Sequence, residues 1–497
     1  MSSVPEIRIR QLNDAPVSAN GEFVLYWMIS SRHSTCNFAL QRAIEWSARL
    51  KKPLLILEAL RVGYEWASDR LHRFVLQGMA DNKAAFADKP VRCYPYVEPK
   101  PGAGRGLVDE LAAQAAVIVT DDFPCFFIPR MLKKTAQRLP TLFEAVDSNG
   151  LLPMRATNTV FPTAYAFRRF LQKELLPHLD KLPQPDPFAC AAIPSPPSIN
   201  RSILQKWPEA THALLDASHE VLAELPIDHS VGPAAFQGGS SAAQDALHKF
   251  LDEKLHRYHE DRSQPEADVA SGLSPWLHFG HVSASDVFAQ LVQRENWSPA
   301  KLADNAKGAR QGWWGMSEAA ESFLDELITW RELGYNFCWQ HDDYDQYGSL
   351  PDWARTTLEE HAADERPHVY SLEDFEAAQT HDELWNAAQT QLVTEGRMHN
   401  YLRMLWGKKI LHWSESPREA LRIMIQLNNK YAVDGRNPNS YSGIFWVLGR
   451  YDRAWGPERP IFGKIRYMTS ENTARKFKVK DYIRKYSQPQ SNKLEQW

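Results

Sequence analysis

Apolar and polar residues follow two different patterns in the first 150 positions of the chain. Short apolar runs, typical of strands buried on both faces, predict strands at 22–28, 53–60, 91–97, 116–120 and 142–146. Between these runs, apolar residues three or four positions apart predict helices at 37–50, 68–86, 107–115 and 126–139. Strands that alternate with helices indicate a doubly wound parallel sheet, which places ligands at the carboxyl ends of its strands. No Gly-x-Gly-x-x-Gly motif follows the first strand, so a dinucleotide site of that type is not indicated.

The pattern changes after residue 180. Residues 181–200 are rich in proline and lack periodicity, which is typical of a linker, and the mixed segment 201–240 runs into Gly-Gly-Ser-Ser. Beyond it the periodicity is helical, and helices are predicted at 243–259, 283–294, 317–339, 384–394, 400–413 and 417–430. We therefore expect an α/β domain over 1–180, an interdomain linker over 181–240 and an all-α domain over 241–497.

Tryptophans and polar residues are mixed in the stretch from His381 to Met468. The tryptophans are Trp385, Trp406, Trp413, Trp446 and Trp455. Core packing explains any one of them, because tryptophan buries a large apolar surface. It does not explain the polar residues among them, which are Asn400, Arg403, Asn428 and Asp434. Buried polar groups need partners, so this mixture suits a planar ligand with polar edges held between helices.

Composition bounds the class of protein. The 497 residues are 43% hydrophobic and 24% charged, no apolar run approaches the length of a membrane span, and the N-terminus lacks an apolar signal core. We therefore expect a globular cytoplasmic protein that does not bind a membrane. No Cys-x-x-Cys pair occurs among Cys36, Cys93, Cys125, Cys190 and Cys338, so neither a metal site nor a disulfide framework is indicated.

Charge is distributed unevenly along the chain. The net charge is −4, but residues 441–497 contain twelve Lys or Arg and five Asp or Glu, so this segment carries about +7 and the remainder about −11. A basic segment with aromatic residues between its charges can neutralise nucleic-acid phosphates. An ordinary solvated tail explains the same charges equally well.

Two further segments contain residues that could bind a ligand or donate a hydrogen bond. The turn 270–280, Ala-Ser-Gly-Leu-Ser-Pro-Trp-Leu-His-Phe-Gly, offers hydroxyl and N–H groups before a helix, which can hold a phosphate or simply cap the helix. Glu326 and Trp330 lie four residues apart on one helical face. A carboxyl group beside an aromatic ring can have a raised pKa and donate a hydrogen bond, although a surface glutamate near a core tryptophan has the same spacing.

Together these segments resemble the photolyase/cryptochrome family, and within it class II cyclobutane pyrimidine dimer photolyases. The resemblance covers nearly the whole chain and is strongest over 270–280 and 317–468. It rests on the motifs ASGLSPWLHFG, FLDELITWREL, QTHDELWNAAQ, GRMHNYLRMLWGKKILHW and DGRNPNSYSGIFW. It implies that the all-α domain binds FAD. The implied cofactor-binding residues are Tyr258, Ser271, Leu273, Ser274, Asn400, Arg403 and Asp434, with Asn428 facing the reactive ring nitrogen of the flavin.

The resemblance also implies a light-driven carbon–carbon lyase. Excited reduced FAD would pass an electron to a cyclobutane pyrimidine dimer flipped out of DNA, and the electron would return after the ring bonds split. Glu326 would hydrogen-bond the dimer, and the residues implied to contact damaged DNA are Arg262, Trp330, Met404 and Trp446. Trp385, Trp406 and Trp413 resemble the chain that re-reduces FAD from the surface. DNA is the implied partner, and the protein is expected to be a monomer.

Several positions depart from the family pattern. Residues 28–37 keep only Asn37 of the antenna motif, which leaves open whether a deazaflavin or folate antenna chromophore binds. Ser263 stands where the family has Asn after the arginine, and 308–315, Gly-Ala-Arg-Gln-Gly-Trp-Trp-Gly, looks like an insertion that either contacts DNA or packs internally.

Three alternative functions share the same motifs. A cryptochrome-like blue-light photoreceptor would use the same FAD and tryptophans, but only about thirty residues follow Met468, whereas cryptochromes often have long C-terminal extensions. Repair of (6-4) photoproducts relies on a histidine pair, and no His-His matches it here. A flavin- or DNA-binding module would bind without splitting the lesion.

Overall fold

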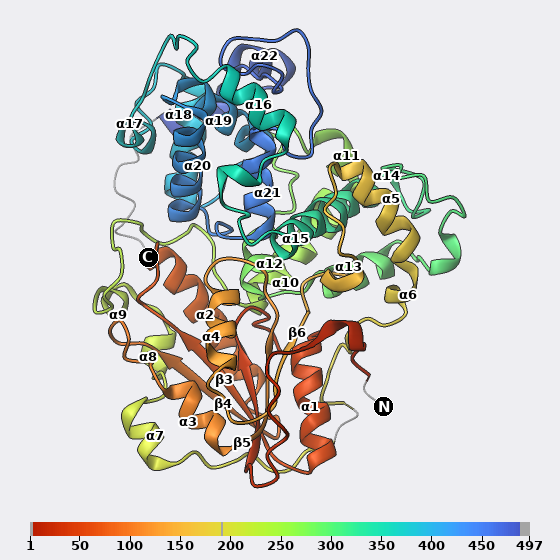
Figure 1. The fold of residues 1–497 in the computed structure, drawn as a ribbon, viewed down its shortest axis with the longest axis vertical. Coiled ribbons are helices and arrows are strands. Elements are labelled where there is room, and N and C mark those ends of the chain that lie inside the picture. Colours follow the sequence, from red (N-terminus) through yellow and green to blue (C-terminus); the bar gives the residue numbers. More distant parts are fainter. Residues whose placement is uncertain (1–2, 190–191, 488–497) are drawn as a thin grey trace.

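Six strands form one sheet in this computed structural model, which describes residues 3–189 and 192–487 (Figure 1). Their order is β1-β6-β5-β2-β3-β4, and every pair except β1–β6 is parallel. The strands are β1 (Ile9–Gln11), β2 (Phe23–Met28), β3 (Leu54–Leu60), β4 (Val91–Val97), β5 (Ala115–Asp121) and β6 (Phe143–Val146). The chain winds outward in both directions from β2, which confirms the predicted doubly wound parallel sheet.

Strand β1 was missed by the sequence analysis. It pairs antiparallel with β6 at the edge of the sheet, where Ile9 lies opposite Val146. Three half-buried or exposed residues contain no apolar run, so the pattern gives no signal. The neighbouring Arg8 is buried, and its guanidinium donates to the carbonyls of Gly150 and Leu151 at 3.1 and 2.6 Å. The edge strand is therefore held by the hydrogen bonds of the buried Arg8 side chain as well as by its pairing with β6.

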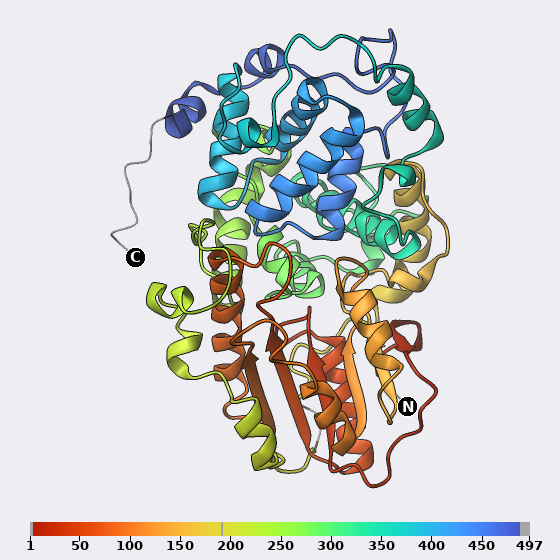
Figure 2. The ribbon, with the colours of Figure 1, turned by 60° about the vertical axis from the view of Figure 1, so that its left-hand side comes forward.

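Helices cover both faces of the sheet, as Figure 2 shows. Val24, Tyr26 and Met28 of β2 pack with α1, whereas Leu25 and Trp27 belong to the core on the opposite face. Side chains alternate across a strand, so burial of all six β2 residues requires cover on both sides. The helices of this layer are α1 (Phe38–Leu50), α2 (Asp69–Ala85), α3 (Leu107–Gln114) and α4 (Ile128–Ala136).

The segment between the sheet and the second helical region is ordered by packing on both. Its helices are α5 (Ala164–Glu174), α6 (Leu176–Leu179), α7 (Arg201–Lys206), α8 (His212–Leu215) and α9 (His219–Ala223). Trp207 is buried, and its indole N–H donates to the Ala103 carbonyl at 2.9 Å, which holds the end of α7 against the α/β layer. Arg168 of α5 instead pairs with Asp325 in the helical layer at 2.7 Å.

The remainder of the described chain is helical and lies above the sheet in Figure 1. Its α-helices are α10 (Ser240–Lys249), α11 (Tyr258–Asp261), α12 (Ser274–Phe279), α13 (Ala284–Arg294), α14 (Glu318–Leu324), α15 (Arg331–Gln340), α16 (Asp352–Glu360), α17 (Leu372–Glu376), α18 (Glu383–Glu395), α19 (Asn400–Trp413), α20 (Pro417–Tyr431), α21 (Pro438–Val447), α22 (Ser470–Lys476) and α23 (Lys480–Ser487). Over residues 241–487 the structure contains no β-strand, which confirms the predicted all-α character of this region.

Two of the predicted long helices are interrupted by π-helical turns. The predicted helix 243–259 contains η3 (Phe250–Lys254), and the predicted helix 317–339 contains η6 (Asp325–Trp330). A π-turn adds one residue to a helical turn, which rotates the side chains that follow it and which often marks a functional site. The turn η6 contains both Glu326 and Trp330, so it sets how these two side chains are presented.

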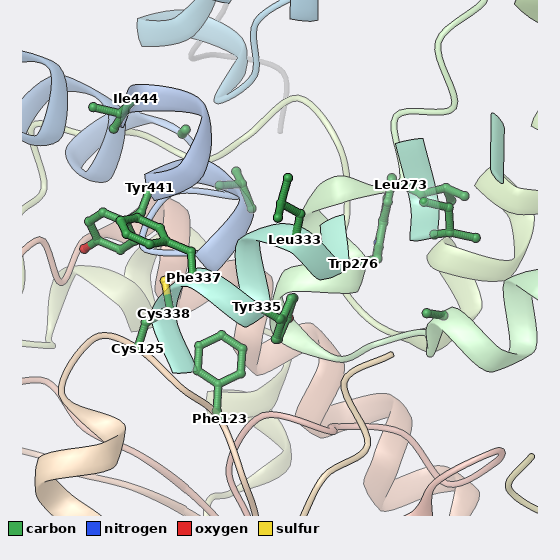
Figure 3. Close-up of a cluster of buried hydrophobic side chains, with 14 of the residues drawn as sticks. Phe123, Cys125, Leu273, Trp276, Leu333, Tyr335, Phe337, Cys338, Tyr441 and Ile444 are labelled. Atoms are coloured by element: carbon green, nitrogen blue, oxygen red, sulfur yellow. The ribbon is translucent and has the colours of Figure 1, made fainter. Parts of the chain in front are cut away.

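The sheet and the helical layer share a core where the loop after β5 meets α15 and α21 (Figure 3). In this view Cys125 of that loop lies beside Cys338, and Phe123 lies near Tyr335, with ring centroids 5.9 Å apart. The Cys125 thiol donates to the Arg436 carbonyl at 3.2 Å, so the two layers are joined by hydrogen bonding as well as by apolar contact.

The structure of residues 3–189 and 192–487 can be examined for disulfides, metal-binding groups and membrane-spanning helices. The cysteines in these ranges are free, and Cys190 lies outside them. No group of three or more His, Cys, Asp or Glu side chains there could hold a metal ion. None of the helices described is long and apolar enough to cross a membrane.

Candidate active site

Helix α19 and the turn after α20 bring Arg403 and Asp434 into contact. Asn437 caps α21 and Pro438 occupies its first turn, which ends the turn 434–437 and fixes where Asp434 lies. The Arg403 guanidinium is 3.1 and 3.4 Å from the two Asp434 carboxylate oxygens, and the Ser274 hydroxyl donates to Asp434 at 2.6 Å. Burial opposes ionisation of Asp434, but Arg403 and Ser274 hold its pKa below the usual value. The site therefore contains an oriented, ionised pair.

The turn before α12 leaves open space close to Ser274, which holds Asp434. Gly272 in this turn has φ of +68°, and a Cβ built there meets no atom within 4 Å. The buried Nδ1 of His399, at the start of α19, has no hydrogen-bond partner. Unsatisfied polar atoms and open backbone edges are the features expected where a planar ligand with polar edges binds. The residues present therefore fit the FAD that the sequence analysis expects.

The other expected cofactor residues come from α11, the start of α12, α19 and α20. Ser271, Leu273 and Ser274 surround Gly272 and begin α12, and Asn400 is exposed at the first position of α19. Asn428 is buried in α20, and its amide donates to the Asn429 side chain at 3.2 Å. Tyr258 begins α11 on the side of Glu326, where its ring packs against Phe250 and Phe323.

Arg262 and Glu326 form an ion pair at the rim of the site. Burial raises the pKa of Glu326, and the Arg262 charge opposes that rise. The two side chains are 29% and 28% exposed, so both remain accessible to a ligand. The sequence predicts a carboxyl group beside Trp330 that donates a hydrogen bond, and the structure adds a cationic partner that favours the ionised form until it is displaced.

Three of the side chains expected to contact DNA are apolar and half-buried. Trp330 comes from η6, Met404 from α19 and Trp446 from α21. Planar bases stack on such surfaces without regard to sequence, because every base has a π face. We call Trp330, Met404 and Trp446 the stacking face.

Cations that the sequence analysis did not single out flank Trp446. The Lys408 ammonium lies 4.8 Å from the Trp446 ring centroid and donates to the Val447 carbonyl at 2.5 Å, and burial lowers its pKa to about 7. The Arg466 guanidinium lies 5.6 Å from the same ring and 4.1 Å from the ring of Trp455. For Arg466 the basic character of 441–497 was the only signal in the sequence, and Lys408 lies outside that segment.

The three tryptophans of the predicted chain are buried and mutually connected. The Trp385 indole donates to the backbone carbonyl of Trp406 at 3.0 Å, and the Trp385 and Trp413 rings are 6.2 Å apart. Trp406 follows Arg403 by three residues on α19 and therefore shares its face. Trp385 of α18 thus contacts both Trp406 and Trp413, and Trp413 lies two turns farther along α19 from Arg403 than Trp406 does.

The insertion 308–315 packs internally through its tryptophans. Trp313 and Trp314 are 4% and 6% exposed, their ring centroids are 4.7 Å apart, and the Trp314 carbonyl accepts from the Trp297 indole at 2.5 Å. Of the two interpretations left open by the sequence, internal packing describes these rings. Arg310 remains exposed on the same loop.

A second cavity lies at the carboxyl ends of the strands, where a doubly wound sheet is expected to bind ligands. Its volume is about 130 Å³, and aliphatic and aromatic side chains line it together with three arginines; the aromatic residues include Trp27, Tyr64, Phe123, Phe126 and Phe127, and the arginines are Arg32, Arg61 and Arg436. Asn37 shapes the adjoining loop, since its amide donates to the Ser31 and His33 carbonyls at 2.9 and 3.0 Å. This cavity can accept a second planar ligand.

Comparison with curated proteins gives matches along nearly the whole chain, although no protein-family model matches it. A deoxyribodipyrimidine photo-lyase of Methanothermobacter thermautotrophicus is 35% identical over 479 residues, which cover 96% of this chain and 97% of the relative. The deoxyribodipyrimidine photo-lyases of Potorous tridactylus and Arabidopsis thaliana are 32% and 33% identical, and the alignments cover 97% and 93% of this chain and 84% and 88% of the relatives.

Two solved structures have the same fold. A class III photolyase from Agrobacterium tumefaciens superposes with a TM-score of 0.65 at 18% identity, over 94% of this chain and 87% of that one. A cryptochrome from Synechocystis sp. PCC6803 superposes with a TM-score of 0.63 at 15% identity, over 93% of this chain and 88% of that one. At these identities the likeness concerns the fold alone.

Proposed function

Because the chain belongs to the photolyase/cryptochrome family and is an enzyme of the deoxyribodipyrimidine photo-lyase type, we propose that it binds FAD and splits cyclobutane pyrimidine dimers in DNA. The observation that carries this proposal is the ionised Arg403–Asp434 pair in a helical layer that also leaves the side chains of the stacking face half-buried. FAD, when bound and reduced, supplies the electron that light transfers to the dimer and that returns after the ring bonds split.

Arg403 and Asp434 orient the cofactor. Asp434 is fixed by Ser274 and Arg403, so the Arg403 guanidinium has a defined direction and donors left over for the polar edge of the flavin. A fixed cation beside the ring stabilises negative charge there without reorganisation. Ser271, Leu273, Tyr258 and Asn400 are proposed to hold the rest of the cofactor, and Asn428 to face its reactive ring nitrogen.

The stacking face receives the flipped dimer. A base that undergoes chemistry must leave the duplex, and a lesion that is already poorly stacked costs less to extrude. Trp330 and Trp446 offer aromatic surfaces and Met404 a polarisable thioether, which suits the two saturated rings of a dimer. Arg466, beside Trp446, is partly exposed and provides positive charge for the approach of the DNA backbone.

Glu326 is proposed to hydrogen-bond a carbonyl oxygen of the dimer, where negative charge develops. This role needs a proton on the carboxyl group. Burial raises the pKa of Glu326, and Arg262 is the cation that works against it. When Arg262 turns toward a lesion phosphate, its charge no longer lowers the pKa of Glu326, and the carboxyl group can keep its proton.

Whether an antenna chromophore binds stays open, and we propose the cavity beside β2 and the loop after β5 as the site that would take one. The aromatic lining and the position at the carboxyl ends of parallel strands support a planar chromophore there. The altered motif at 28–37 leaves the choice between a deazaflavin and a folate open.

Light-dependent repair tests the function directly. Purified protein loaded with reduced FAD would be mixed with an oligonucleotide that contains one cyclobutane thymine dimer, and recovery of thymine absorbance would be followed under blue light. We expect recovery in the light, none in the dark, and none with an oligonucleotide that contains a (6-4) photoproduct. Bound, photoreducible FAD without dimer splitting would contradict the proposal and favour the photoreceptor alternative.

A further inference from the structure

The outer end of the tryptophan chain does not reach the surface. Trp413 is only 1% exposed, so a reductant dissolved in water has no direct access to its ring. The same ring, however, contacts two further aromatic side chains. The ring centroids of His381 and Tyr370 lie 4.8 and 5.8 Å from that of Trp413, and both contacts are edge-on. The aromatic path therefore continues beyond the third tryptophan.

Tyr370 and His381 are joined by a hydrogen bond. The Tyr370 hydroxyl is 2.7 Å from Nδ1 of His381, and the backbone N–H of Tyr370 donates to the Trp413 carbonyl at 3.0 Å, which fixes the tyrosine against the tryptophan. Tyr370 is half-buried, whereas His381 is exposed and stacks on the exposed His368 at 3.8 Å. A phenol that contacts an electron acceptor on one side and an imidazole on the other can lose an electron and a proton together.

We propose that Tyr370 is the terminal electron donor of the tryptophan chain and that His381 accepts its proton. The inference rests on the proposed function, which supplies the oxidised Trp413. One electron passes from the Tyr370 phenol to the Trp413 radical cation, and the phenolic proton moves to Nδ1 of His381. The products are neutral Trp413, a neutral Tyr370 phenoxyl radical and protonated His381. A solution thiol then returns a hydrogen atom to the phenoxyl, and His381 releases its proton to water.

The charges around the pair favour this direction. Lys409 lies 4.9 Å from the Trp413 ring centroid and pairs with Asp382 at 3.3 Å, so a cation adjoins the ring and makes its radical cation a stronger oxidant. Partial burial, helped by the charges of His368 and Lys409, lowers the pKa of His381, whereas Asp382 and Glu471 oppose this. A neutral His381 has the free lone pair that the proton transfer needs.

A second tyrosine provides a matched control. Tyr467 is also half-buried and lies in the same aromatic cluster, but its ring contacts His412 and Phe462, 6.0 and 4.9 Å away, rather than Trp413. His412 separates it from the chain, since His412 itself lies 6.3 Å from Trp413. Removing the Tyr467 hydroxyl should therefore leave the outer step unchanged.

Transient absorption and electron paramagnetic resonance after a laser flash on oxidised, FAD-loaded protein test the proposal. In the wild type and in Tyr467→Phe we expect a tryptophan radical that is replaced by a phenoxyl radical. In Tyr370→Phe we expect the phenoxyl signal to be lost and the tryptophan radical to persist. In His381→Phe, which keeps a ring but removes the acceptor, we expect phenoxyl formation to slow. Flavin content and thermal unfolding show whether each variant is folded.

The possible failures are distinguishable. A tryptophan radical in the wild type with no phenoxyl radical, or an undiminished phenoxyl signal in Tyr370→Phe, overturns the assignment of Tyr370 and leaves the tryptophan chain intact. Absence of any tryptophan radical in the wild type overturns the chain itself, and with it this inference. A phenoxyl signal that is lost in Tyr467→Phe but kept in Tyr370→Phe would show that Tyr467 is the terminal donor, and it would contradict the proposal.

Discussion

Glu326 is the residue on which the repair chemistry depends most, because two influences on its pKa oppose one another. Burial raises the pKa, and the Arg262 guanidinium counteracts that rise. A neutral carboxyl group can donate a hydrogen bond to a carbonyl oxygen, whereas a carboxylate can only accept. The protonation state of Glu326 in the complex with DNA therefore determines whether it assists the reaction.

Glu326→Gln is expected to lower the yield of dimer splitting while FAD stays bound. The amide is a weaker donor toward developing negative charge, and a hydrogen bond to a charged group contributes about 1.5–3 kcal/mol. Repair yield per absorbed photon and flavin content would be measured together. Glu318→Gln, at an exposed position in the preceding helix α14, is the matched control. An unchanged yield in Glu326→Gln would remove this carboxyl group from the mechanism.

The sequence indicated which residues belong to the site better than it indicated which side chains contact one another. The resemblance assigned Arg403 and Asp434 to the cofactor site, and in the structure the two side chains form an ion pair. It assigned Arg262 and Glu326 separate roles, and their contact with one another was not foreseen, since the two are 64 positions apart and no periodicity connects them. Lys408 was missed because a lysine in a helix is usually solvated, and only the packed structure shows its burial beside Trp446.

The element that determines the geometry of the site is the π-helical turn η6. It lies between α14 and α15, and its first residue, Asp325, is buried with Arg168 of α5, where two N–O distances are 2.7 and 3.0 Å. Apolar periodicity predicted an uninterrupted helix here, because one extra residue in one turn barely disturbs the pattern. The other strands of the sheet could be predicted, because a short continuous apolar run between turn residues fits a buried strand better than a helix. The three-residue β1 has no such run.

Asp325→Asn is expected to lower the free energy of unfolding by about 3–5 kcal/mol, because it leaves the buried Arg168 without its counter-ion. Denaturant unfolding of the wild type and the variant measures the difference. Asp252→Asn is the control, since its pair with Arg294 is exposed and should contribute below about 1 kcal/mol. Equal losses in the two variants would show that the Arg168–Asp325 pair does not anchor η6.

At the scale of the whole molecule, the helical layer is attached to the sheet layer by buried polar contacts. Glu332 of α15 accepts hydrogen bonds from the backbone N–H groups of Leu151 and Leu152 at 2.6 and 3.0 Å. Burial raises the pKa of Glu332 to about 7, despite these two bonds and the nearby Arg331. Sequence patterns predicted the two layers but not their contact, because such contacts join positions about 180 residues apart without any local signal.

The raised pKa of Glu332 makes stability depend on pH. In the unfolded chain this carboxyl group ionises at about pH 4.3, and in the folded protein at about 7. Below both values it is protonated in either state, and its contribution to stability is fully present. As the pH rises from about 4.3 to about 7, only the unfolded state gains the charge, so stability falls by on the order of 1 kcal/mol per pKa unit.

Glu332→Gln should remove that part of the pH dependence, because an amide does not ionise. The measurement is the free energy of unfolding at a series of pH values from 4 to about 8, in the window set by the two pKa values. We expect the difference between the wild type and the variant to vary with pH in this window and to level off above it. A constant difference across the series would show that Glu332 has an ordinary pKa.

The central claim is that one helical layer contains a repair face and a separate electron chain. Repair by Trp406→Phe, started from chemically reduced and from oxidised FAD-loaded protein, tests it most directly, with the wild type in parallel. We predict normal repair from the reduced state and loss of light-driven recovery from the oxidised state, since Trp406 is buried on the Arg403 side of α19, whereas the residues of the stacking face are half-buried. Equal repair from both states would contradict the electron chain, and loss of repair from both would contradict its separation from the repair face.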